Sequence, residues 1–98
     1  MEHLTIYFKH GLRDIIPYHN YIKLAKEEIV RAGLGEYLGD DMAIDGGDAE
    51  AVFSCENSIE LFEYLKTGLV ALPFMRGAKI TLTFGELETK APEKVFYI

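Results

Sequence analysis

The sequence has one cysteine, no tryptophan and no apolar run approaching the roughly 20 residues that a membrane-spanning helix requires. A single cysteine, Cys55, cannot form an intramolecular disulfide, so nothing in the sequence indicates an oxidising compartment. Residues 1–4 run directly into a strand-like pattern and lack the basic start and apolar stretch of a secretion signal. We therefore expect a cytoplasmic protein that does not enter a membrane.

Lysine and arginine are missing from the middle of the chain, residues 36–63, although the formal net charge of the whole chain is −6. The acidic residues in this segment are Glu36, Asp40, Asp41, Asp45, Asp48, Glu50, Glu56, Glu60 and Glu63. Binding to a phosphate backbone needs a basic surface, so we do not expect a nucleic acid as the partner. A basic protein is the partner that this charge distribution favours.

The chain has 98 residues, of which 49% are apolar and 27% are charged, which is ordinary for a globular protein. A chain of this length forms one hydrophobic core and not two. No repeat, low-complexity stretch or linker divides it. We therefore expect a single domain, residues 1–98.

Apolar and polar residues alternate in several short segments, which is the period of two expected of strands with one face on a core. The segments are 3–9, 36–45, 49–55, 78–84 and 95–98, and the last predicts an edge strand. Gly46 and Gly47 predict the tight turn of a hairpin, because glycine readily takes the positive φ that such turns need.

Two other segments have apolar residues at spacings of three and four, which predicts helices. The first begins after Asp14, a candidate N-cap, and ends at Gly33. Its apolar stripe consists of Tyr18, Tyr21, Ile22, Ala25, Ile29 and Ala32. The second begins at Asn57 or Ser58 and ends before Pro73. Its apolar stripe consists of Ile59, Phe62, Leu65, Leu69 and Leu72.

In chain order these elements give βαββαβ with an additional C-terminal strand. This order predicts an α+β fold of the ferredoxin-like plait type, in which two helices pack on one face of an antiparallel sheet.

The acidic hairpin with its tyrosine is the strongest candidate for a binding surface. Tyrosine is enriched in interface hot spots because it offers a large, stiff and amphipathic contact area. The candidate partner-binding residues are Tyr37, Asp40, Asp41, Asp45, Asp48 and Glu50. A merely solvated hairpin and a metal site are the alternatives. A calcium loop starting at Asp41 does not fit, because Ala43 and Val52 would stand where carboxylates are needed.

No group of residues resembles an active site, and we expect no enzymatic activity. His3, His10 and His19 lack the spacing of zinc ligands, so we expect surface or partly packed side chains. Cys55 precedes a helix N-terminus, where a thiol can become reactive, but it also lies on the inward face of its strand, which favours a core residue. The glycines of residues 33–35 match neither a dinucleotide fingerprint nor a P-loop, so we expect no cofactor.

Residues 73–77 allow two interpretations. An arginine beside a glycine turn, as in Arg76 and Gly77, can clamp an anion. The favoured interpretation is a helix-to-strand connection in which Phe74 or Met75 fills the core.

The small size, the acidity, and residues 35–41 together with 45–50 resemble small bacterial immunity proteins of contact-dependent or polymorphic toxin systems. Proteins of this class bind and neutralise a cognate toxin, often a basic nuclease. The resemblance implies that this chain is an acidic inhibitor whose partner is a basic toxin domain.

A self-associating structural domain or a ligand-sensing domain is the alternative function. Residues 94–98 form a mostly apolar strand with one evident neighbour, and such an edge can pair with a second copy to give a homodimer.

Overall fold

The computed structural model describes residues 1–9, 16–42, 47–86 and 90–98. The strands are β1 (Glu2–Lys9), β2 (Glu36–Met42), β3 (Asp48–Cys55), β4 (Lys79–Thr83) and β5 (Glu93–Tyr97). The helices are α1 (Ile16–Arg31), α2 (Ser58–Val70) and the short 3-10 helix η1 (Pro73–Met75). The predicted N-cap Asp14, the end of the second predicted strand and the turn residue Gly46 lie outside the described residues.

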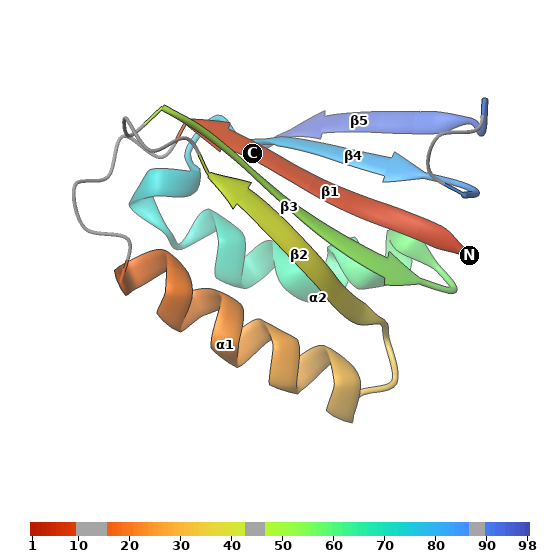
Figure 1. The fold of residues 1–98 in the computed structure, drawn as a ribbon, viewed down its shortest axis with the longest axis horizontal. Helices are drawn as coiled ribbons and strands as arrows, with labels where there is room; N and C mark the ends of the chain where they lie inside the picture. The colour runs from red at the N-terminus through yellow and green to blue at the C-terminus, as the bar shows by residue number, and fades with distance from the viewer. Residues whose placement is uncertain (10–15, 43–46, 87–89) are drawn as a thin grey trace.

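The five strands form one antiparallel sheet in the order β2-β3-β1-β4-β5. Figure 1 shows α1 and α2 on the same side of this sheet, and no helix of the described residues covers its other side, the open face. The prediction of an α+β fold with two helices and an antiparallel sheet is confirmed for the described residues. In the same residues, no helix has both the length and the apolar character needed to cross a membrane.

The core lies between the sheet and the helices because each strand turns alternate residues toward them. In β1 these are Leu4, Ile6 and Phe8, and in β3 they are Ala49, Ala51, Phe53 and Cys55, all buried. From α1 the buried residues are Tyr18, Ile22, Ala25 and Ile29. The predicted stripe of α1 is therefore confirmed at these four positions, whereas Tyr21 is half-buried and Ala32 lies exposed beyond the helix end.

The predicted stripe of α2 was wrong at its first residue. Ile59 is 45% exposed, and Leu61 is fully buried in its place. The Glu2 carboxylate on β1 accepts hydrogen bonds from the Ser58 amide (2.8 Å) and hydroxyl (2.9 Å), which turns Ser58 inward and Ile59 outward. The side chain of Asn57 completes the cap by accepting a hydrogen bond from the Glu60 amide at 3.0 Å.

α2 also ends earlier than the predicted end, which was just before Pro73. The helix ends at Val70, so that Leu72 lies beyond it and is half-buried. Pro73 then begins η1, which buries Met75 completely. The favoured interpretation of residues 73–77, a connection that fills the core, is confirmed for Met75.

The two edges of the sheet are β2 and β5. The pairing of β2 with β3 shifts between Tyr37 and Gly39, which leaves Leu38 as the extra residue of a bulge. Gly39 has φ +152°, a conformation that residues with a side chain rarely adopt. The bulge decides which way the acidic side chains of β2 point.

Candidate functional site

Three exposed carboxylates gather on the open face of the sheet, at the end of the β2-β3 pair. Asp41 stands directly opposite Glu50 in the strand register, and Asp48 is two residues from Glu50 along β3, on the same face. All three side chains are exposed. We call Asp41, Asp48 and Glu50 the acidic cluster.

Tyr7 on the neighbouring strand β1 is the aromatic residue beside this cluster. It lies directly opposite Glu50 in the register of β1 and β3. Interaction with the Asp48 carboxylate, together with desolvation, raises the pKa of Tyr7. A hollow of about 250 Å³ is lined by Tyr7, Ala49 and the acidic cluster.

Sequence reasoning did not select Tyr7. Its place on the polar side of the alternation in β1 was visible, but its position beside Asp48 depends on the pairing of β1 with β3, which no local pattern reveals.

Tyr37 and Asp40, which were predicted to belong to the same site, lie on the helix side of the sheet. The Tyr18 hydroxyl of α1 donates a hydrogen bond to Asp40 Oδ2 at 2.8 Å. The half-buried Tyr37 ring packs against Phe53, with 5.3 Å between ring centroids. Burial and a hydrogen bond with Asp40 raise the pKa of Tyr37 to about 12. These two residues therefore join β2 to the core, and the structure brings together only Asp41, Asp48 and Glu50 of the predicted set.

Asp45, the remaining predicted residue, lies outside the described residues. No three His, Cys, Asp or Glu side chains among the described residues are grouped closely enough to hold a metal ion. The metal alternative for the hairpin stays a prediction, since Asp45 belongs to it.

Apolar side chains extend the acidic cluster along the β2 edge of the sheet. A second hollow, of about 410 Å³, is lined by Leu38, Gly39, Asp40, Asp41, Glu50 and Val52. Leu38 on the bulge is 52% exposed. A hollow lined by both apolar and acidic residues can accept an apolar side chain that is surrounded by cations.

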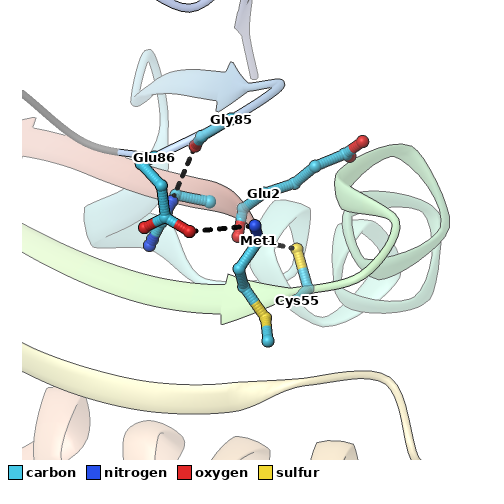
Figure 2. Close-up of polar contacts among 6 residues, drawn as sticks. Met1, Glu2, Cys55, Gly85 and Glu86 are labelled. Carbon is cyan, nitrogen blue, oxygen red and sulfur yellow. Dashed lines mark hydrogen bonds and ion pairs between the residues drawn. The ribbon is translucent and has the colours of Figure 1, made fainter. Parts of the chain in front are cut away.

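Cys55 is a core residue. Its side chain is 1% exposed. Figure 2 shows its sulfur directed at the Glu2 carbonyl oxygen, 3.7 Å away, beside the contact of the Met1 amine with Glu86. Burial, with a smaller contribution from the Glu2 carboxylate, raises the pKa of Cys55 to about 11. A thiol in this environment is a poor nucleophile at neutral pH.

We expect a thiol reagent to label the native protein at neutral pH at least about 100-fold more slowly than the unfolded protein, because a pKa higher by about two units leaves that much less thiolate. The native labelling rate should rise tenfold per pH unit up to about pH 10 without a plateau. Cys55 is the sole cysteine, so mass spectrometry of the intact chain reports this reaction alone. Rapid native labelling that levels off near pH 8.5 would contradict the buried position.

The histidines were expected to be surface or partly packed side chains, and His3 differs from this expectation. His3 is only 5% exposed, and its Nδ1 lies 3.0 Å from the Gly85 carbonyl oxygen. His3 is buried in part because Gly85, which follows β4, lies against the start of β1. His19 is exposed as expected, and His10 lies outside the described residues.

Comparisons of the chain with protein families, curated proteins and solved structures find no significant match.

Proposed function

We propose that this protein acts by binding a basic protein through the acidic cluster, and not by catalysis. We further propose that it is an immunity protein that neutralises a cognate toxin, most simply one of the basic, nuclease type.

The observation that carries this proposal is the placement of Asp41 directly opposite Glu50. Like charges in directly opposed positions of two strands destabilise a sheet. The exposed Asp48 on the same face adds to this repulsion. A basic partner relieves it on binding, so the repulsion within the free protein favours the complex.

Tyr7, Leu38 and Val52 are the proposed sources of affinity in this interface. They line the two hollows beside the acidic cluster. Charges mainly accelerate association and set specificity, whereas buried aromatic and apolar side chains supply most of the affinity.

We also propose that the chain is a ferredoxin-like plait extended by one edge strand, and that it works in the cytoplasm. The neighbouring positions of β2, β3, β1 and β4 and the two helices on one face support the first of these proposals. Many unrelated functions share that fold, so the function rests on the site alone.

Self-association through β5 is the second candidate function. β5 is an edge strand whose Val95 is 44% and Tyr97 71% exposed. By contrast, the acidic side chains and the bulge of β2 disfavour pairing at the other edge.

One purification separates the two candidates. From cells that produce the protein, purification at low salt should retain a basic protein at one-to-one stoichiometry, and high salt should release it. With the isolated pair, the triple variant Asp41→Lys, Asp48→Lys and Glu50→Lys should associate about 10- to 1,000-fold more slowly than the unaltered protein at low salt.

The matched control carries the same change of charge on or beside α1 and α2. Glu27→Lys, Glu56→Lys and Glu63→Lys alter three exposed residues outside the acidic cluster, so association should remain close to that of the unaltered protein. Equal slowing by both triple variants would mean that net charge alone matters. A homo-oligomer that retains no second protein would favour self-association instead.

A further inference from the structure

A third pocket, with positive charge, lies at the end of the open face where β1 ends and β4 begins. Its volume is about 290 Å³. Three cationic residues line it together with two tyrosines: Lys9, Arg76, Lys79, Tyr7 and Tyr97. We call this set the basic pocket.

The sheet register and one turn bring these side chains together. Lys79 at the start of β4 stands between Tyr7 of β1 and Tyr97 of β5, being paired with each of them. Lys9 is two residues beyond Tyr7 and so lies on the same face. Arg76 precedes the turn at Gly77, which has φ +80° and whose amide donates a hydrogen bond to the backbone oxygen of Ile98.

The three cations have no carboxylate partner within the described part of the chain. The ion pair there joins the Met1 amine to Glu86, at the other end of the sheet. Asp48 stands opposite Lys9 in the register but makes no ion pair with Lys9 among these residues. In a chain of net charge −6, three neighbouring cations without such a partner favour an anion from outside.

We propose that the basic pocket binds a small phosphate monoester. A phosphate monoester carries about −1.5 to −2 charges at neutral pH, which three cations balance better than they balance a single carboxylate. The Arg76 guanidinium offers a fork of donors that matches two phosphate oxygens, and the lysines add point charges. The rings of Tyr7 and Tyr97 offer a flat apolar surface to the organic part of the ligand. The volume of the pocket is just below the range for small-molecule sites, which is roughly 300–1,000 Å³, so the ligand must be small.

Amide chemical shifts of the isotopically labelled full chain test this proposal, with phenyl phosphate and inorganic phosphate as probes. Both should give saturable shifts at Gly77, Lys79 and Tyr97, and phenyl phosphate should bind more tightly because its ring packs on the tyrosines. Arg76→Gln and Lys79→Gln should each weaken the affinity about tenfold or more, because each removes hydrogen bonds to a charged group.

The matched controls are Lys23→Gln and Lys26→Gln, which remove the same charge from exposed positions on α1 and should leave the affinity unchanged. The remainder of each spectrum reports whether a variant is folded. Shifts that do not saturate, or an affinity that Arg76→Gln leaves unchanged, would overturn the proposal. So would succinate binding at least as tightly as phenyl phosphate, since the pocket would then prefer carboxylates.

Discussion

Replacing Phe53 with alanine is expected to lower the free energy of unfolding by about 3–5 kcal/mol. Phe53 is fully buried in β3 and stands opposite Leu4 of β1 and Tyr37 of β2. Its removal leaves a cavity between three strands whose backbones are held by hydrogen bonds and cannot close around it. A domain of ordinary stability has about 5–15 kcal/mol in total, so this loss is a large part of it.

Urea unfolding followed by circular dichroism measures this loss, as a lower midpoint with an unchanged slope. The control is Ile59→Ala on α2, which removes an aliphatic side chain that is 45% exposed. Its effect should stay within about 0.5 kcal/mol. A loss at Ile59 as large as that at Phe53 would mean that α2 turns a different side toward the sheet.

Gly35→Ala should cost about 1–3 kcal/mol for a different reason, the lack of space for one methyl group. A Cβ at this position would lie 2.5 Å from the carbonyl oxygen of Ser54 and 3.1 Å from the Cβ of Cys55. The first of these atoms is backbone in β3, paired with β1 and β2 on its two sides. The neighbouring strand therefore cannot yield without distorting the sheet.

Gly68→Ala in α2 is expected to raise the stability, in contrast to Gly35→Ala. A Cβ there meets only a Tyr21 ring carbon at 3.6 Å, an ordinary contact. Alanine loses less conformational entropy than glycine in a helix, so this variant should be more stable by about 0.5–1 kcal/mol. Thermal unfolding of the two variants side by side checks both signs. A Gly35→Ala protein as stable as the unaltered chain would refute the close approach at this strand.

Local patterns in the sequence were sufficient for the elements of the fold but not for the direction of every side chain. The alternation in β1 and β4 and the stripe of α1 required only periodicity, and all of these were predicted. Ile59 was assigned to the core from the periodicity of α2 alone. That periodicity does not reveal the contact of Ser58 with Glu2, a residue at the other end of the sequence. A contact between such distant residues leaves no local signal.

In the candidate site, too, local patterns did not predict the direction of every side chain, because of the bulge at Leu38. In a regular strand, Tyr37 and Asp41 would lie on the same face, since they are an even number of residues apart. The bulge at Leu38 reverses this relation, so that Asp41 joins Asp48 and Glu50 on the open face while Tyr37 packs on Phe53. The consequence of Gly39 for the two faces follows only from the pairing of β2 with β3.

The central place of β1 in the sheet has a consequence for how the chain folds. β1 comes first among the strands in the sequence, yet both of its partners, β3 and β4, follow in later parts of the chain. Each partner can pair with β1 only after a long loop has closed, and proteins dominated by such non-local pairing fold slowly. During synthesis on the ribosome, both edges of β1 therefore stay unpaired until β3 has emerged. One edge then remains available to other chains until β4 has been made.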